Sequence, residues 1–419
     1  MLEWFFLDLN GFFASCEQYD RPELRGRPVG VCPVLAGGGA VIAASYEAKA
    51  KGIGMGVRAA EARRLCPGIE LVQARPDRYV EIHHSIMTSI EKHVPITKTY
   101  SIDEWAIRLL GDERRVDQAV ELAQRVKRQI ADDHEGMLPC SVGLAPSRLL
   151  AKTACELQKP DGLTVLTLDR MPDILAPMSL TDIPGIGSGM HERLRSDDVT
   201  TPAELWALSK ADCRRIWGSV QGEYFWMGFH GQHAEEVPTR RSSMGHAHIL
   251  PPQYRNDAGA HGIMTRLLCK AVMRCRRDGY FAHRLTAHVS FTSGHRWADE
   301  IVLPAVHDTP TVLEHFERLW RRRPWRDACA AALPGETSRP LWEPKKVSVD
   351  LGGLTPAGST PGHLFAQTER ADKLSAVIDR VNRKYKAHAL HPGSMTHVVD
   401  YRMDDKIAFG RIPEQDIAM

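Results

Sequence analysis

An aspartate interrupts the first apolar segment of the chain. Asp8 lies in the run Phe5–Leu9, whose other residues are apolar and which reads as a buried strand. Burying a carboxylate costs free energy unless a cation lies close enough to neutralise it. Far along the chain, Asp103 and Glu104 also adjoin apolar residues. We expect the three acids to meet on neighbouring strands, so the fold must bring these distant segments together.

Three converging carboxylates would suit two Mg²⁺ ions, which take oxygen ligands and promote nucleotidyl transfer. One ion would activate an attacking 3′ hydroxyl, and the other would neutralise the leaving pyrophosphate. Each acidic motif also has a simpler interpretation by itself. An acid at the end of a strand often caps the next helix, and adjacent acids are common in turns.

The bulk composition restricts the class of protein. A length of 419 residues suggests about three or four domains, and the net charge of +2 limits any polyanion binding to local patches. The nine cysteines are odd in number and form no Cys-x-x-Cys pair, which argues against a zinc site and a disulfide framework. We see neither a signal peptide nor an apolar stretch of membrane-spanning length, and we expect free thiols in a cytoplasmic protein.

The pattern of segments changes along the chain. Strands alternate with amphipathic helices over residues 1–165, which indicates an α+β or α/β catalytic core. Residues 166–233 read as short helices, and 234–241 as a linker. Strands and helices return over 242–350, and 351–419 reads as a flexible tether and a loosely ordered tail with one amphipathic helix.

A Gly-rich turn precedes one of the short helices. In Ile183–Gly187, Gly185 and Gly187 flank Ile186 directly after Pro184. Such a turn can aim backbone amides at a phosphate from a helix N-terminus, without reading bases. The alternative is an ordinary turn between packed helices.

Residues 239–326 are locally basic, with fifteen Lys/Arg against seven Asp/Glu. The dense points are Arg240–Arg241, Arg274–Arg277 and Arg321–Arg323. This unit can form an electrostatic footprint for a polyanion, or merely a solvated basic face. His246 and His248 could bind a metal, but without a third ligand nearby we favour surface or packing roles.

Taken together, these segments resemble the Y-family translesion DNA polymerases. The resemblance rests on Asp8–Glu17, Ser101–Glu104, Ser141–Ala145 and Lys152–Gly162, and it covers about residues 1–350 in the right order. It implies a multidomain right-hand architecture of α+β class. A palm of antiparallel sheet and helices would occupy 1–165 with fingers inserted at about 20–75, followed by a helical thumb with a helix-hairpin-helix at 166–233. A linker at 234–241 would lead to a little-finger domain at 242–350.

The resemblance also implies roles for individual residues. Asp8, Asp103 and Glu104 would be the catalytic metal ligands, with the Leu9 carbonyl as a backbone ligand for one of two Mg²⁺ ions. Phe13 would be a steric gate against ribonucleotides. The implied contacts to the incoming triphosphate are Gly11, Phe12, Tyr46, Lys49 and Lys159. Those implied for DNA are Pro184, Gly185, Ile186, Gly187, Arg240 and Arg241.

Four positions depart from the usual family pattern. Asn10 stands where many members have an acid, and Lys49 replaces the commoner Arg, giving phosphate a point charge instead of a bidentate fork. Ala43 replaces a frequent Thr. Trp105 stands where a small residue is usual and is expected at the rear wall of the pocket. None of these changes removes a metal ligand, and the chain looks like a polymerase IV-type member with some polymerase V-like features.

Family members grip DNA weakly and gain from a sliding clamp, because tethering raises effective concentration. The resemblance therefore implies primer–template DNA, dNTPs and a sliding clamp as partners of a monomer. Leu364–Phe365, after the tether, keeps the apolar and aromatic part of the family's clamp-binding peptide. The alternative is that this pair docks the tail helix.

The leading hypothesis is a template-directed DNA polymerase that bypasses damaged template with low fidelity. A second hypothesis is a catalytically weak or inactive adaptor that binds DNA and clamp in a mutagenesis complex. Such adaptors typically lose one or more of the acids, and all three are present here. A nucleotide cyclase with a palm-like fold is a third, but it would need neither the hairpin nor the basic unit.

Overall fold

The computed structural model describes residues 1–33, 35, 39–233, 240–325, 341–357, 366–385 and 389–401. These residues form two compact units, one within 1–233 and one within 240–401. The division falls in the segment predicted as a linker. In the described ranges, no helix is long and apolar enough to span a membrane.

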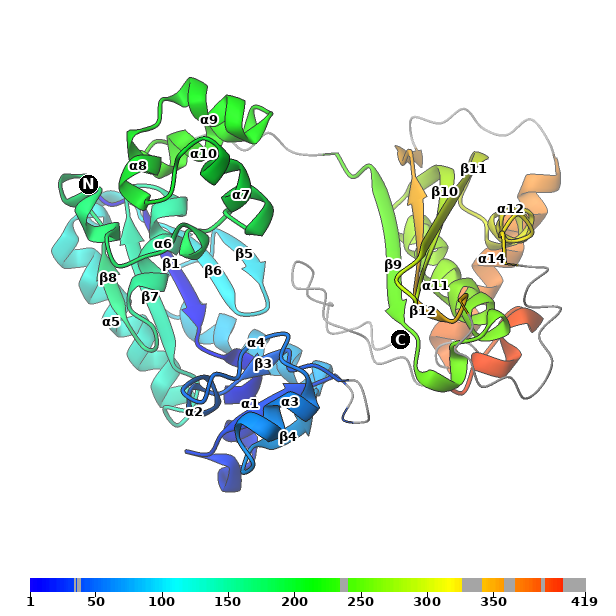
Figure 1. Ribbon diagram of the computed structural model, residues 1–419, viewed down its shortest axis with the longest axis horizontal. Helices are drawn as coiled ribbons and strands as arrows, with labels where there is room; N and C mark the ends of the chain where they lie inside the picture. The colour runs from blue at the N-terminus through cyan, green and yellow to red at the C-terminus, as the bar shows by residue number, and fades with distance from the viewer. Residues whose placement is uncertain are drawn as a thin grey trace. The chain divides into compact units, whose positions relative to one another are not determined.

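The first unit is built on a five-stranded sheet in the order β5-β6-β1-β7-β8 (Figure 1). The strands are β1 (Trp4–Leu9), β5 (Lys98–Ser101), β6 (Glu104–Arg108), β7 (Cys140–Ala145) and β8 (Leu163–Val165). All neighbours are antiparallel except β7 and β8. The predicted strands at both acidic motifs are therefore adjacent in the sheet.

Helices cover both faces of this sheet. Phe5, Leu7 and Leu9 of β1 face a core shared with α4 (Pro76–Glu91) and α5 (Val116–Asp133). The alternate residues Trp4 and Phe6 face α6 (Arg148–Leu157). Because side chains alternate along a strand, Asp8 belongs to the α6 side. The Ser147 side chain caps helix α6 by accepting a hydrogen bond from the Leu150 amide at 3.1 Å.

A small lobe lies between β1 and α4 in the chain. It consists of a three-stranded sheet in the order β3-β2-β4, with β2 (Val29–Cys32), β3 (Ala43–Ala44) and β4 (Glu70–Gln73). Its helices are α2 (Tyr46–Lys49) and α3 (Ala59–Leu65), with the short helix η1 (Pro22–Leu24). Helix α1 (Phe12–Asp20) connects β1 to this lobe.

Residues 166–233 are helical, as the sequence predicts. They comprise η3 (Leu168–Arg170), η4 (Asp173–Leu175), η5 (Leu180–Asp182), α7 (Ser188–Ser196), α8 (Pro202–Ala207), α9 (Lys210–Trp217) and α10 (Gln221–Phe229). Their apolar side chains, such as Ile183, Leu194 and Phe229, join the core on the α6 side of the main sheet.

The second unit is an antiparallel sheet in the order β11-β10-β12-β9 packed on helices (Figure 1). Its strands are β9 (Ser243–Ile249), β10 (Tyr280–Phe291), β11 (Arg296–Val306), β12 (Pro344–Gly352) and β13 (Thr355–Pro356), which pairs with β10. Its helices are η6 (Pro252–Tyr254), α11 (Asp257–Arg277), α12 (Thr309–Trp320), α14 (Ala366–Tyr385) and η8 (Gly393–Val398). The α+β class is confirmed.

The described part of the expected loose tail is instead folded onto the second unit. Met395 and Val398 of η8 are fully buried in its core beside α11. The carbonyls of Val398 and Tyr401 accept hydrogen bonds from Arg266. The final residues, 402–419, lie outside the described residues.

Candidate active site

The pairing of β1 with β6 brings the three predicted acids together. Asp8 is the register partner of Glu104. One step further, the Leu9 amide donates to the Asp103 carbonyl at 2.9 Å. Paired residues on adjacent strands share a face of the sheet, so Asp8 and Glu104 both face α6. Asp103 lies in the tight turn between β5 and β6, at the same end of the sheet.

Two lysines neutralise this acidic edge. Lys152 Nζ of α6 lies 2.6 Å from Glu104 Oε1. Lys159 Nζ, just beyond the same helix, lies 2.8 Å from Asp8 Oδ1 and 2.9 Å from Glu156 Oε1. The acids and lysines therefore form one connected set at the end of β1.

Asn10 holds the loop that carries Lys159. Its Oδ1 accepts hydrogen bonds from the Asp161 amide at 2.7 Å and from Ser141 Oγ at 3.2 Å. Asn10 is fully buried, and its Nδ2 has no partner among the described residues. The Asn10 side-chain amide therefore links the end of β1 to the loop that contains Lys159 and Asp161.

Burial sets the protonation behaviour of the acids. It raises the pKa of Asp8 to about 7; the Asp103 carboxylate adds to this rise, and Lys159 opposes it. Burial also raises the pKa of Asp103, with a further rise from Glu104. Although burial works against its charge, Asp8 and Glu156 raise the pKa of Lys159 above its usual range. The carboxylates repel one another and require nearby positive charge.

This donor set fits divalent cations. The available ligands are carboxylate and carbonyl oxygens, which Mg²⁺ prefers. The ammonium groups of Lys152 and Lys159 form ion pairs with Glu104 and Asp8, so both carboxylates are placed to bind a cation. In the parts of the chain that the structure describes, no three His, Cys, Asp or Glu side chains are arranged as a closed metal cluster. Asp103 Oδ1 instead accepts from Ser101 Oγ at 2.5 Å.

Three of the residues implied for the triphosphate lie together beside the acids. Gly11 has φ 62°, and a Cβ there would lie 3.1 Å from the Ala44 carbonyl and 4.0 Å from Lys49 Nζ. Lys49 Nζ sits 4.2 Å from the centre of the Tyr46 ring. Burial lowers the pKa of Lys49, and Lys159 lowers it further. The Lys49 ammonium is therefore close enough to Lys159 to be affected by its charge.

Phe13 lies at the start of α1 with its ring held from behind. The ring stacks on Tyr79 of α4 at a centroid distance of 4.4 Å and an interplanar angle of 12°. The Tyr79 hydroxyl donates to Glu17 Oε1 at 2.7 Å, and Arg75 Nε donates to the same oxygen at 2.9 Å. Phe12 is buried in the core next to them. The Phe13 ring is therefore fixed in orientation.

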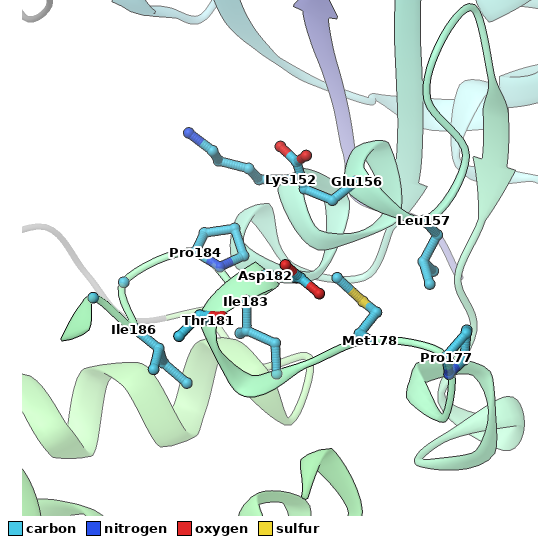
Figure 2. A pocket seen from close by; sticks show the side chains of 12 residues that line it. Lys152, Glu156, Leu157, Pro177, Met178, Thr181, Asp182, Ile183, Pro184 and Ile186 are labelled. Atoms are coloured by element: carbon cyan, nitrogen blue, oxygen red, sulfur yellow. The ribbon is translucent and has the colours of Figure 1, made fainter. Parts of the chain in front are cut away.

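A cavity of about 780 Å³ adjoins the acidic edge. Figure 2 shows Lys152 and Glu156 projecting from α6 on one side, with Pro184 and Asp182 on the other. Lys152 reaches Glu104, and Glu156 reaches Lys159, which contacts Asp8. The cavity thus lies between the Gly-rich hairpin and the two α6 side chains that contact Glu104 and Lys159.

The hairpin has the conformation that its glycines predict. Gly185 has φ 93°, which favours glycine, and the Ile186 amide donates to the Ile183 carbonyl at 3.1 Å. Gly187 is the N-cap of α7, and a Cβ on it would meet nothing within 4 Å. The Met190 and His191 amides donate to the Gly187 carbonyl at 3.0 and 2.9 Å, so the amides of Ser188 and Gly189 are the ones left at the N-terminus of α7 for a ligand.

Most of the basic clusters in the second unit are engaged internally. Arg276 makes a bidentate ion pair with Asp379 at 2.8 Å, and Arg241 Nη1 lies 2.5 Å from Asp278 Oδ2. Arg323 pairs with Asp257 at 2.6 Å. The polyanion footprint expected at these points is therefore largely cancelled by acids distant in sequence. Arg240 is exposed.

The histidines of β9 have packing roles. Arg274 Nη1 contacts His246 Nε2 at 3.1 Å, and His248 Nε2 contacts the Tyr401 hydroxyl at 3.0 Å. The sequence favoured such roles over a metal site. The predicted clamp-binding pair, Leu364–Phe365, lies outside the described residues.

Trp105 does not line the pocket, contrary to the sequence prediction. It pairs with Leu7 and so points to the opposite face of the sheet from Glu104. There it is fully buried and stacks on His83 at 5.0 Å. The prediction failed because it took adjacency in sequence for adjacency in space, whereas successive strand residues face opposite sides.

Sequence reasoning did not single out Lys152, Glu156 or Tyr79. Lys152 and Glu156 are four residues apart, so they lie on one face of α6, where Lys152 contacts Glu104 and Glu156 contacts Lys159. That spacing was readable, but its meaning depends on α6 lying across β1. Tyr79 gives no signal of its own, because its contact with Phe13 joins two distant helices.

The chain matches two family models. Residues 7–156 match the impB/mucB/samB family, and residues 241–364 match the C-terminal domain of the same family. Together these segments include more than half of the chain. The first segment contains all three acids, and the second begins in the described part of the second unit.

Relatives and solved structures agree with this assignment. A DNA polymerase IV of Moorella thermoacetica is 31% identical over 394 residues, which cover 92% of this chain and 94% of the relative. A Y-family DNA polymerase chimera of Dbh and Dpo4 matches with a TM-score of 0.66 at 23% identity, covering 85% of this chain and 100% of that one. An insertion ternary complex of Dbh DNA polymerase matches with a TM-score of 0.52 and the same identity and coverage.

The two structural matches show the fold, and the full-length similarity to DNA polymerase IV shows the activity. The enzyme hypothesis is therefore the correct one. The chain belongs to the impB/mucB/samB family and is a Y-family, translesion DNA polymerase of the DNA polymerase IV type.

Proposed function

We propose that this polymerase extends a primer 3′ end with two Mg²⁺ ions held at the end of β1. Asp8, Asp103 and Glu104 would supply carboxylate ligands, and the Leu9 carbonyl a backbone ligand. When bound, the ions would lower the charge barrier between the 3′ hydroxyl and the triphosphate. The single observation that carries this proposal is the register pair of Asp8 and Glu104, with Asp103 at the adjoining turn.

The lysines would exchange partners as substrate binds. Lys159, now 2.8 Å from Asp8, would be released toward the triphosphate once other cations neutralise that carboxylate. Its contacts with Asp8 and Glu156 keep it charged and oriented until then. Lys152 would play the equivalent part for Glu104. The chain's own ammonium groups thus prevent mutual repulsion of the acids in the free enzyme.

The incoming nucleotide would lie between the acids and the small lobe. Tyr46, Lys49 and Lys159 would bind its phosphates, with help from the amides of Gly11 and Phe12. The contact of the Lys49 ammonium with the Tyr46 ring, and the tight approach of Gly11 to Ala44, support a shared binding surface. Lys49 would act as a point charge that can shift among phosphate oxygens.

Phe13 would discriminate between sugars by steric exclusion. A flat ring backed by Tyr79 cannot retreat when a 2′ hydroxyl approaches, because the Tyr79 ring is itself fixed through Glu17. Exclusion of this kind is a repulsive element against the wrong substrate. The rigid support behind the ring is what favours this role over simple core packing.

Primer–template DNA would occupy the cavity beside α6 and the hairpin. Pro184, Gly185, Ile186 and Gly187 would present backbone amides to phosphates, which binds DNA without reading its sequence. Arg240 is exposed and available for the same purpose, whereas Arg241 would first have to leave Asp278. We therefore assign Arg241 a smaller part in DNA binding.

We further propose that the enzyme works as a monomer in the cytoplasm with a sliding clamp as partner. The eight cysteines within the described ranges are free thiols, which suits a reducing compartment. Leu364–Phe365 would bind the clamp. Weak contacts to DNA make such tethering valuable.

The test is primer extension by the purified full-length chain. Extension should require Mg²⁺, proceed on undamaged and lesion-bearing templates, and disappear in Asp103→Ala. A folded Asp103→Ala variant that extends primers as fast as the parent enzyme would refute the proposed metal site. Adding clamp should lengthen the products. Substituting Leu364 and Phe365 by alanine should abolish this lengthening and leave extension without clamp unchanged.

A further inference from the structure

The turn that carries Asp103 is held from behind by a histidine of α4. Only Ile102 and Asp103 separate β5 from β6, so the turn is tight. His83 Nδ1 lies 2.7 Å from the Ile102 carbonyl oxygen. Because a carbonyl oxygen only accepts, Nδ1 is the protonated ring nitrogen that donates this hydrogen bond. Both residues are buried, so no water competes for the bond.

The same imidazole ring contacts the residue that follows Glu104. It stacks on the fully buried Trp105 ring at a centroid distance of 5.0 Å and an interplanar angle of 18°. His83 therefore contacts the chain on both sides of the Asp103–Glu104 pair, at the carbonyl before it and at the indole after it. The stacking fixes the plane of the imidazole, and with it the direction in which Nδ1 donates.

Two other hydrogen bonds hold the turn from different directions. The Leu9 amide donates to the Asp103 carbonyl at 2.9 Å, and Ser101 Oγ donates to Asp103 Oδ1 at 2.5 Å. These donors belong to β1 and β5, whereas His83 belongs to α4, which packs on the face of the sheet opposite α6. Three separate elements thus fix the position of one carboxylate. Mg²⁺ tolerates little departure from octahedral geometry, so its ligands need such support.

Helix α4 supports the proposed nucleotide site at a second place. Tyr79, one helical turn before His83, is the residue that stacks on Phe13. One helix therefore lies behind both the proposed steric gate and the acidic turn. This arrangement provides an internal comparison. A general loosening of α4 would disturb both places, whereas loss of the His83 hydrogen bond would disturb only the turn.

We propose that His83 is a positioning residue for Asp103 and Glu104. Through Nδ1 it holds the Ile102 carbonyl and keeps both carboxylates directed toward the cations, although it touches neither metal nor substrate. This inference rests on the proposed function, because it takes the two acids as metal ligands. Replacing a residue that orients metal ligands typically weakens metal binding by about 10- to 100-fold.

The test compares His83→Asn with His83→Leu in the full-length protein. The two new side chains are nearly equal in size and both lose the stack on Trp105, but only asparagine can donate to the Ile102 carbonyl. Mn²⁺ binding would be measured by electron paramagnetic resonance, with a dideoxy-terminated primer–template and dNTP present. The leucine variant should bind Mn²⁺ roughly 10-fold more weakly and need about 10-fold more Mg²⁺ for half-maximal extension. The asparagine variant should match the parent enzyme in both measurements.

Two controls separate positioning from a loss of stability. Ile86→Val removes one methyl group from a fully buried side chain of α4 and no hydrogen bond, so it should lower stability without changing Mn²⁺ binding. The preference for dNTP over rNTP should stay constant in every variant, because Phe13 and Tyr79 are unchanged. Hydrogen exchange over residues 99–106 should be faster in the leucine variant than in the asparagine variant.

Three results would show that His83 is only structural and that the proposal is wrong. In these, the leucine variant binds Mn²⁺ like the parent, the asparagine variant binds it equally weakly, or sugar preference falls together with Mn²⁺ binding. If His83→Leu does not fold, His83→Phe removes the same donor while keeping a ring against Trp105, and the same comparison applies. Normal extension by Asp103→Ala would instead overturn the metal site itself, and this inference with it.

Discussion

Lys159 Nζ lies 2.8 Å from Asp8 Oδ1, so the cation assigned to the triphosphate and the acid assigned to metal binding are paired with each other. Glu156, 2.9 Å from the same nitrogen, completes the pair. In the free protein, Lys159 thus offsets the charge that burial makes costly on Asp8. A metal ion or a triphosphate bound at the proposed site would have to compete with this internal ion pair.

Lys159→Met should raise the KM for dNTP by roughly 10- to 100-fold, because a charge-assisted hydrogen bond to phosphate contributes about 1.5–3 kcal/mol. Steady-state primer extension would measure this. Lys127→Met is the control, since Lys127 pairs with Asp161 in the same loop but not with the acids. An unchanged KM in Lys159→Met would remove Lys159 from the nucleotide site.

Asp103→Asn should lower kcat by about a thousandfold or more while the protein remains folded. Loss of one metal ligand forfeits several kcal/mol of transition-state stabilisation. The asparagine can still accept the hydrogen bond of 2.5 Å from Ser101, so the turn should persist. Single-turnover extension and a thermal melt on the same sample would check both parts. A large drop in melting temperature would mean that Asp103 is mainly structural.

Phe13→Ala should reduce the preference for dNTP over rNTP by on the order of a hundredfold, because the cavity left by the ring admits a 2′ hydroxyl. The comparison is the ratio of kcat/KM for the two sugars. Tyr79→Phe is the matched control: it keeps the ring stacked on Phe13 but removes the hydroxyl bond to Glu17. That variant should lose about 1 kcal/mol of stability and keep its sugar preference. Equal selectivity in Phe13→Ala and the parent enzyme would end the gate assignment.

Gly185→Ala should weaken binding of primer–template several-fold, irrespective of its sequence. A side chain at φ 93° strains the hairpin and displaces the amides proposed to hold phosphates. Gly218→Ala, at φ 67° where α9 ends, imposes comparable strain away from the hairpin. Anisotropy with primer–template DNA should separate the two variants. Similar affinities would indicate that the turn only joins helices.

Met395→Ala should destabilise the second unit by about 2–5 kcal/mol, because it opens a cavity in a fully buried site. Leu390→Ala, only a few residues earlier but 44% exposed, should change stability by no more than about 0.5 kcal/mol. Urea unfolding, with hydrogen exchange of α11 as a local probe, would compare them. If both substitutions are neutral, the packing of residues 389–401 contributes nothing to the domain.

The sequence predicted the parts of this molecule that are encoded locally. The apolar run around Asp8 predicts β1, and the glycines at 185 and 187 predict the hairpin, because each follows from a few adjacent residues. The family resemblance then indicated which acids share a site. The prediction for Trp105 was wrong since it required the strand register, which sets the face each residue occupies.

Long-range ion pairs were also beyond the sequence. Arg276 belongs to a dense basic cluster, yet its partner Asp379 lies 103 positions away. Nothing in either segment indicates this pairing. The pair neutralises Arg276 and attaches α14 to the second unit, so this arginine does not present its charge to a polyanion. Charge counted along a chain therefore differs from charge presented at a surface.

The alternation along β1 means that the proposed metal site and the apolar core depend on the same short run of residues. Deleting or inserting one residue in β1 before Asp8 would place the carboxylate on the face that packs against α4 and α5. A phenylalanine or leucine would then take its place on the α6 face. In a redesign of this enzyme, loops can vary in length, whereas β1 tolerates substitutions but no insertion or deletion.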